Sequence, residues 1–420
     1  MRPSARPPAS ARRWRRPSRR WLIVAALFAV TYGISTPLAA YGVFLPILAE
    51  AFGWSRGAIS AALSVNLLVG GLAGFVIGAL ADRHGPRILL MTTVVMAGTA
   101  FALVGAVHAL WQLYLFVGLL GGIGMSSFYL LGAATVTHWF VTQRGLALAL
   151  VLVGFNLGYV TGGPLAAWLI GAHGWRAAYA ILGCGCGLLT LLAALTIRLP
   201  RSGEVGPRAA TVAIGHSAAM EATLRDALRD PRQWLLNASW LCMGGLALMI
   251  NVHIVPFARD AGLGLAGASF ALTAYGVGAA AGRLLGGVVS DRLGSVATQR
   301  LAYVVTALSL VVLYWAPTHA ALLGSMAAFG AGFAATDTLV VKIVPDLFGV
   351  RAIGAIMGVL ALGWRSGAAL GPAAAGFLYD ATGSYAWSFG LAPAVALTSW
   401  ACFALALRWP VSTRGRGRPG

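Results

Sequence analysis

The sequence predicts an all-α membrane protein that is built from two similar halves. Of its 420 residues, 59% are hydrophobic and only 10% are charged, and the mean hydropathy is +0.81. The apolar stretches are continuous, which favours membrane-spanning helices. The segment 78–85 also returns in similar form as 287–294, which is 209 residues further on. A duplicated helical body is the architecture of secondary transporters.

Twelve stretches are long and apolar enough to cross a bilayer. A hydrocarbon core of about 30 Å requires about 20 apolar residues in a helix. The expected spans are 21–48, 58–80, 88–107, 111–136, 146–170, 175–197, 233–257, 267–289, 299–317, 319–342, 352–376 and 385–408. Six precede and six follow a polar segment, so we expect two six-helix bundles, 21–197 and 233–408.

Three polar segments surround these bundles. Residues 1–20 combine arginines with prolines, which predicts a disordered basic arm. A basic segment before an apolar one also fits a signal peptide, but cleavage would remove half of a helix that the repeat requires. Residues 198–232 form a linker, and the apolar spacing of 220–230 predicts a short amphipathic helix within it. Residues 409–420 form a basic tail.

The basic residues predict the orientation in the membrane. They gather in the two terminal segments, in the linker, and in loops on one side of the expected spans. The opposite loops hold only Arg56, Arg176 and Arg259. By the positive-inside rule, both termini and the linker are cytoplasmic. The net charge of +19 therefore favours contact with anionic lipid, and we expect no nucleic-acid partner.

Glycines extend the repeat into the expected helices. Gly154, Gly158 and Gly162 recur 209 residues later as Gly363, Gly367 and Gly371, and Gly53 and Gly174 recur as Gly262 and Gly383. Spacings of four residues place small side chains on one stripe of a helix. Another helix backbone can approach closely along such a stripe.

Other kinds of chemistry are not indicated. The cysteines Cys184, Cys186, Cys242 and Cys402 fall within apolar helices, so neither disulfides nor a metal site is expected. The sequence shows no phosphate-binding loop, no nucleophile with a base and no paired carboxylates. We therefore expect no enzyme, no catalytic residues, no cofactor and no metal.

The two repeated segments share the pattern Gly-x3-Asp-Arg-x-Gly, at Asp82-Arg83 and at Asp291-Arg292. With six spans on each side of a linker, the chain resembles the major facilitator superfamily. The resemblance implies that these four residues are conformational latches, whose charges pair across neighbouring helices in one state of the transport cycle. The alternative is a tight turn that only orients two helices.

A narrower resemblance is carried by segments 41–46 with 52–56, 139–140 with 144–147, and 371–372 with 379–385. These are similar to bacterial monocarboxylate transporters and oxalate:formate antiporters, which implies a bacterial inner (cytoplasmic) membrane protein. In that branch an arginine of the eighth helix binds the substrate carboxylate, and Arg283 matches it. Arg365 is the nearest counterpart of a basic residue in the eleventh helix.

The chain also departs from this branch. Animal monocarboxylate transporters carry an acid one turn before the eighth-helix arginine and a lysine in the first helix. Here the first position is Ala279, and the first expected helix holds no lysine. Proton coupling as in those proteins is therefore not implied.

The repeat also isolates charges that have no counterpart in the first half. Subtracting 209 pairs Arg283 with Gly74, Arg365 with Asn156, Asp337 with Phe128, Lys342 with Ala133, and His253 with Phe44. A charge within the hydrocarbon costs at least ~2.5–3.5 kcal/mol, so it faces a wet cavity or a partner. Two arginines indicate an anionic ligand, because a guanidinium binds a carboxylate through two parallel hydrogen bonds. Lys342 lies near a helix end, where it can snorkel.

Four further residues are candidates with two interpretations each. Asp337 is either a proton carrier or the counter-ion of Arg365. His253 either titrates near neutral pH at a substrate site or is a hydrogen-bonded packing residue. Tyr129 and Asn156, in the first half, are candidate hydrogen-bond partners of the substrate, or packing residues.

These observations predict a secondary active transporter of a small organic anion, a mono- or dicarboxylate. It would work by alternating access as a monomer in lipid, either as a proton symporter or as an anion exchanger. One alternative is a drug or metabolite:proton antiporter, favoured by the glycine-rich segment 154–164 but disfavoured because the first half lacks an acid within a span. Another is a non-transporting membrane sensor, disfavoured by the short tails.

Overall fold

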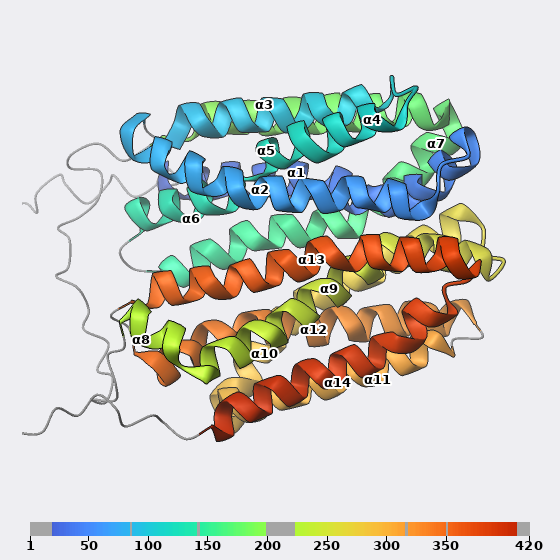
Figure 1. Cartoon of the computed structure of the whole chain (residues 1–420). Coiled ribbons are helices and arrows are strands. Elements are labelled where there is room, and N and C mark those ends of the chain that lie inside the picture. Colours follow the sequence, from blue (N-terminus) through green and yellow to red (C-terminus); the bar gives the residue numbers. More distant parts are fainter. Residues whose placement is uncertain are drawn as a thin grey trace, which may run out of the picture.

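The computed structural model describes residues 19–84, 86–140, 143–198, 223–315, 318–349 and 352–409. In these ranges all of the regular structure is helical, as the sequence predicts. Ten of the helices there are long and apolar enough to cross a membrane. The helices lie roughly along one direction in two groups (Figure 1).

The first group runs from α1 to α7. Its helices are α1 (Arg19–Phe52), α2 (Arg56–His84), α3 (Pro86–Val104), α4 (Leu110–Leu113), the π-helix η2 (Tyr114–Gly121), α5 (Gly122–Met125), α6 (Phe128–Trp139) and α7 (Arg144–Thr196). Both α1 and α3 pack against α7. Helix α7 bends at Gly174, whose backbone is not helical, between the spans expected at 146–170 and 175–197.

The second group follows the short helix α8 (Leu224–Arg229), which lies where the linker predicts a helix. Its helices are α9 (Pro231–Asp260), α10 (Leu265–Leu293), α11 (Ser295–Tyr314), α12 (His319–Phe348), α13 (Ile353–Thr382) and α14 (Ala386–Arg408). Helix α13 packs along α9, and α10 packs along α12. The pairing of α9 with α13 repeats that of α1 with α7.

The span expected at 111–136 is not one regular helix. It is made of α4, η2, α5 and α6, with a bend at Ser126 and Ser127 between α5 and α6. The Asn66 side chain of α2 donates to the carbonyl of Val117 at 2.7 Å, and the Ser126 hydroxyl donates to the carbonyl of Ile123 at 2.6 Å. Side chains that bond backbone carbonyls compete with the helical ladder, and this explains the irregularity.

Glycines end the helices at one end of the molecule. Gly53, Gly174, Gly262 and Gly383 have φ of 67°, 77°, 90° and 68°, a backbone conformation that favours glycine. The first two are the repeat equivalents of the last two. We call this end, opposite to α8 in Figure 1, the glycine-turn end.

The glycine stripes make equivalent contacts in the two groups. A Cβ on Gly162 of α7 would lie 2.6 Å from the carbonyl oxygen of Thr36 on α1. A Cβ on Gly371 of α13 would collide with the carbonyl oxygen of Gly245 on α9. Thr36 and Gly245 are themselves 209 residues apart. The duplication therefore preserves the individual backbone contacts as well as the order of helices.

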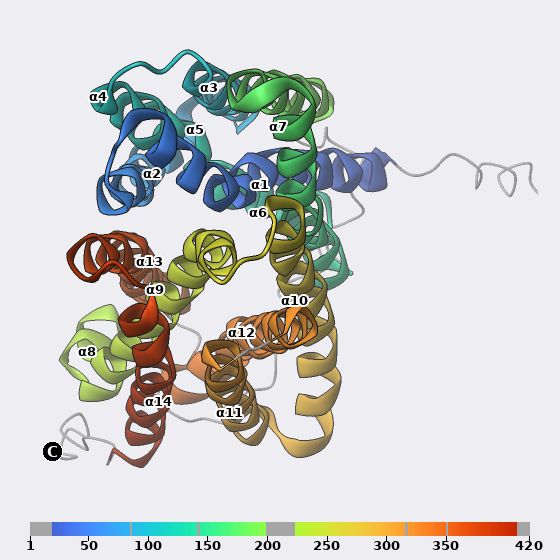
Figure 2. The same ribbon diagram turned by 90° about the vertical axis from the view of Figure 1, so that its right-hand side faces the viewer.

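The groups meet along two seams, one between α2 and α13 and the other between α7 and α10. Helices α1 and α9 cross between these seams, as the end-on view shows (Figure 2). A Cβ on Gly42 of α1 would lie 2.9 Å from the carbonyl oxygen of Asn251, its own repeat equivalent on α9. Equivalent positions thus face each other at the centre of the molecule.

The glycine contacts lead to a stability prediction. Gly367→Ala would place a methyl group against the carbonyl of Leu241, and overpacking of this kind costs about 1–3 kcal/mol. We expect a lower midpoint of thermal unfolding in detergent. Gly358→Ala on the same helix is the control, because a Cβ there meets nothing within 4 Å and alanine is the better helix former. Equal midpoints for the two variants would contradict the packing described here.

Candidate functional site

Arg283 and Asp337 form an ion pair between α10 and α12. Nη1 of Arg283 lies 2.8 Å from Oδ2 of Asp337, and the side chains keep 24% and 34% of their surface exposed. Gly278 and Gly282 bring the helices together, since a Cβ on either would collide with the α12 backbone. The alternative in which Asp337 is the counter-ion of Arg365 is wrong in this structure, because its partner is Arg283.

The Arg283 guanidinium retains hydrogen-bonding capacity. Its Nε is buried and has no hydrogen-bond partner among the described residues. A guanidinium carries five N–H donors, and the carboxylate of Asp337 lies at Nη1. A second anion could therefore bind Arg283, either beside Asp337 or in its place.

Arg365 crosses the seam between α13 and α2. A Cβ on Gly70 would lie 3.7 Å from its Nη1, and one on Gly71 would lie 3.5 Å from its Cδ. The two glycines thus leave the space that the arginine occupies. Among the described residues Arg365 has no hydrogen-bond or ion-pair partner. It is a half-buried cation without a described counter-ion.

Asn156 lies at the other seam. The residue is 6% exposed, and its Nδ2 has no hydrogen-bond partner in the described part of the chain. Its carbonyl oxygen would lie 3.1 Å from a Cβ on Gly276 of α10, the helix that carries Arg283. A buried donor without a partner marks a place where water or a polar ligand atom can bind.

His253 does not face a free space in this structure. It is fully buried, and its Nδ1 lies 2.8 Å from the Tyr385 hydroxyl. Its Nε2 lies 2.8 Å from the carbonyl oxygen of Pro372 and 3.3 Å from Oγ of Ser60. This arrangement matches the interpretation of His253 as a hydrogen-bonded packing residue.

The second copy of the repeated motif is partly described. Lys342 of α12 donates to Oγ of Ser290 at 2.8 Å and to Oδ1 of Asp291 at 3.0 Å. Asp291 therefore pairs with a neighbouring helix of its own group, while Arg292 lies exposed in the last turn of α10.

Three other predicted side chains lie outside what the structure describes. They are Asp82 and Arg83 of the first motif copy and Tyr129 of α6. Their backbone lies in helices.

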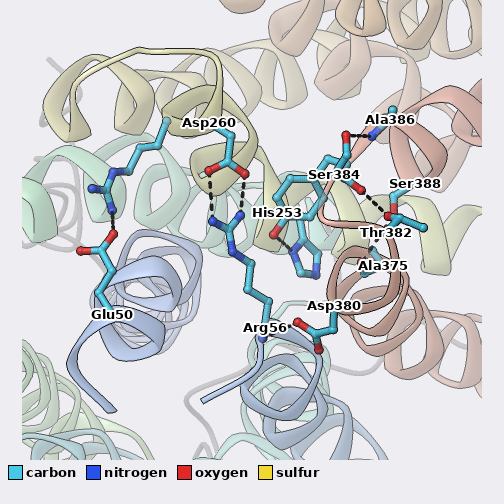
Figure 3. Close-up of polar contacts among 12 residues, drawn as sticks. Glu50, Arg56, His253, Asp260, Ala375, Asp380, Thr382, Ser384, Ala386 and Ser388 are labelled. Carbon is cyan, nitrogen blue, oxygen red and sulfur yellow. Dashed lines mark hydrogen bonds and ion pairs between the residues drawn. The ribbon is translucent and has the colours of Figure 1, made fainter. Parts of the chain in front are cut away.

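A second cluster, whose residues were not among the predicted site residues, joins the two groups at the glycine-turn end (Figure 3). Arg56, the first residue of α2, donates from Nη1 and Nη2 to the two oxygens of Asp260, at 2.7 and 3.0 Å. Its guanidinium lies 3.9 Å from the ring centre of Tyr379. Asp380 accepts from the backbone N–H groups of Arg56 and Gly57, at 2.9 and 2.8 Å. We call Arg56, Asp260, Tyr379 and Asp380 the Arg56 cluster.

Two further features lie near this cluster. Nη1 of Arg259 lies 3.1 Å from Oε1 of Glu50, its repeat equivalent 209 residues away. A pocket of about 490 Å³ opens beside the cluster, with Asp260, Tyr379 and Tyr385 among its lining residues. The sequence did carry a signal for Arg56, Asp260 and Asp380, because their repeat equivalents are the uncharged residues Leu265, Ala51 and Gly171.

Comparisons with known proteins agree with this architecture. The family model described as Major Facilitator Superfamily matches residues 21–268 and 247–420. Monocarboxylate transporter 11 of Mus musculus is 30% identical over 385 residues, covering 88% of this chain and 83% of that protein. The oxalate:formate antiporter of Oxalobacter formigenes is 30% identical over 248 residues, covering 58% and 56%.

A solved structure shares the fold. The bacterial homolog of the human lysosomal transporter Spinster, in an inward-facing and occupied conformation, superposes with a TM-score of 0.73. The alignment covers 94% of this chain and 97% of that chain, at 18% sequence identity.

The ion pair leads to a prediction about coupling. Removing Arg283 or Asp337 alone leaves an unpaired charge in a partly desolvated place, so Arg283→Leu and Asp337→Leu should each lower the unfolding midpoint. The double variant should be less destabilised than the sum of the two, by about 0.5–3 kcal/mol. Thermal unfolding of the four proteins in detergent measures this coupling. If the destabilisation of the double variant equals the sum of the two single variants, the ion pair is contradicted.

Proposed function

The chain belongs to the major facilitator superfamily, and from this premise we propose that it is a secondary active transporter of a small organic carboxylate. It would act by alternating access in the bacterial cytoplasmic membrane. The observation that carries the proposal is Arg283, a partly exposed arginine within a predicted span whose Nε has no described partner. The names of the monocarboxylate and oxalate:formate relatives support the same class of substrate.

The proposed topology has twelve membrane-spanning helices in two six-helix bundles, 21–197 and 233–408. The division of α7 at Gly174 and the four segments α4 to α6 over the fourth span support this count. The basic segments 1–20, 198–232 and 409–420 support a cytoplasmic location for both termini and the linker. The glycine-turn end is then extracellular, and the transporter works as a monomer in lipid.

We propose that Arg283 exchanges partners during transport. When Asp337 is ionised it pairs with Arg283, and a proton on Asp337 weakens that pair. The guanidinium can then bind the substrate carboxylate, so that one proton and one carboxylate move together. The acid comes from α12 here, because the position one turn before Arg283 is Ala279.

Arg365 extends the site to a second carboxylate. It stays charged at physiological pH, and a dianion such as oxalate would neutralise both arginines. Release of such a substrate would expose Arg365 without a counter-ion, which favours exchange for another anion over net release. Monocarboxylates would then be transported by proton symport, and dicarboxylates would be transported by anion exchange.

The other candidate residues have supporting roles in this proposal. Asn156 would donate its free Nδ2 to a carbonyl or hydroxyl group of the substrate, and Tyr129 is kept as a second donor. Asp82, Arg83, Asp291 and Arg292 would latch the cytoplasmic side. His253 would hold α9 in place through its hydrogen bonds to Ser60, Tyr385 and Pro372.

The drug:proton antiporter alternative loses support from the same residues. An organic cation needs an acid that is free to attract it, and Asp337 is paired with Arg283. Arg365 adds a positive charge without a described counter-ion. An organic cation would be repelled by this site.

Uptake measurements test the substrate class. Labelled lactate, pyruvate, formate and oxalate are offered to proteoliposomes, and we expect at least one to accumulate. Arg283→Ala should reduce uptake by about 10- to 100-fold, the loss expected for hydrogen bonds to a charged group. Arg300→Ala is the matched control, since Arg300 is exposed on α11. No binding or uptake of any of these anions would refute the carboxylate assignment.

A pH gradient tests the coupling. Asp337→Asn keeps the shape of the acid but cannot take up a proton, so accumulation driven by an inward proton gradient should disappear. Exchange of external for internal substrate should remain, because it needs only the arginines. Gradient-driven accumulation in Asp337→Asn would remove Asp337 from the coupling role.

A further inference from the structure

We propose that Arg56 is the extracellular latch of this transporter and that it locks one of the two seams only. The inference rests on the proposed function for its orientation. It assigns the closed-outside state to contacts that form between α2 of the first group and α9 and α13 of the second (Figure 3). In this structure those contacts are all made, so the extracellular end is closed.

The Arg56 cluster uses three kinds of contact at one place. The guanidinium binds Asp260 with two parallel hydrogen bonds, the stronger geometry for such a pair. It also lies over the ring of Tyr379, a cation–π contact. The Arg56 side chain is only 15% exposed, which reduces screening by water and salt.

Asp380 of the second group caps the first turn of α2, a helix of the first group. Its carboxylate accepts the first two backbone N–H groups of α2, from Arg56 and Gly57. Such N–H groups have no partner within their own helix, and an anion there is favoured by the helix dipole. Opening this end would therefore remove the cap of α2 as well as the ion pair.

The backbones at this point are in contact. A Cβ on Gly376 of α13 would lie 2.7 Å from the Cα of Gly57. A Cβ on Gly57 would lie 2.6 Å from Oδ2 of Asp380. The glycines thus allow the carboxylate to reach the end of the helix.

The repeat shows that the other seam lacks this lock. The equivalents of Arg56, Gly57, Gly376 and Asp380 are Leu265, Ala266, Ala167 and Gly171. A Cβ on Gly171 would meet nothing within 4 Å. Because neither the acid nor the arginine has a counterpart, the seam between α7 and α10 should separate first when the extracellular end opens.

The second ion pair at this end provides a matched comparison. Arg259 and Glu50 also join the two groups, but their side chains are 30% and 67% exposed. Exposed pairs contribute little. Each pair joins the first group to α9 through one arginine. Comparing the loss of Arg56 with the loss of Arg259 therefore separates the effect of the Arg56 cluster from a general loss of positive charge.

The labelling rate of a buried cysteine measures how often the extracellular end opens. Ser60 lies one turn below Arg56 on α2, is fully buried and faces His253 of α9. We would introduce Ser60→Cys in a background with the four native cysteines replaced. A membrane-impermeant maleimide is then added to the extracellular side of intact cells, and the labelling rate is measured.

Arg56→Ala and Asp380→Asn should each raise this rate at least about tenfold, as for an equilibrium shift of about 1.4 kcal/mol. Arg56→Lys should lie between these variants and the parent, because lysine keeps the charge but not the paired hydrogen bonds. Arg259→Ala should change the rate less than about twofold. Asp380→Asn is nearly isosteric and guards against misfolding, and size-exclusion profiles identify folded protein.

Two outcomes would overturn the latch. One is an unchanged labelling rate in folded Asp380→Asn and Arg56→Lys, and the other is an equal increase in Arg259→Ala. Uptake by the same proteins separates this result from the proposed function. If the variants label faster but the parent transports no carboxylate, the latch is supported and the substrate class is refuted. If the parent takes up carboxylate but the labelling rates of the variants are unchanged, the substrate class is supported and the latch is refuted.

Discussion

Close approach of helix backbones at glycine is the constraint on which the rest of this structure depends. Without a hydrophobic force between helices in lipid, packing and polar contacts must hold them together. Gly162 and Gly371 set the same contact in both groups, and Gly282 brings α10 against α12 beside Arg283. A larger residue at any of these positions would move the helices that carry the charged side chains.

The charged residues follow from the same close packing. An arginine within a span needs a partner or a wet surface, and the narrow distance between α10 and α12 lets Asp337 supply the partner from a neighbouring helix. Arg365 instead occupies the space left by Gly70 and Gly71 across a seam. Arg283 is thus neutralised within its group, while Arg365 has no described counter-ion.

Asymmetry on a symmetric scaffold links these sites to movement. The central arginines belong to the second group, whereas Arg56 belongs to the first and finds Asp260 and Asp380 in the second. A transporter that rocks one half against the other must break contacts at one end and form them at the other. In the proposed alternating-access cycle, strong contacts on one seam would give the movement a direction, because the other seam would separate at lower cost.

The sequence by itself determined the helical class, the duplication, and which ionisable residues break its symmetry, because hydropathy and a fixed offset of 209 residues are local properties of the chain. Arg283, Arg365 and Asp337 could all be named in this way. Only the tertiary structure decided that Asp337 pairs with Arg283, that His253 is enclosed by Tyr385 and Pro372, and that Arg56 reaches Asp260. Those pairings depend on which helices are in contact and on how far the helices are shifted along their axes. Residues far apart in sequence carry no local signal of these contacts.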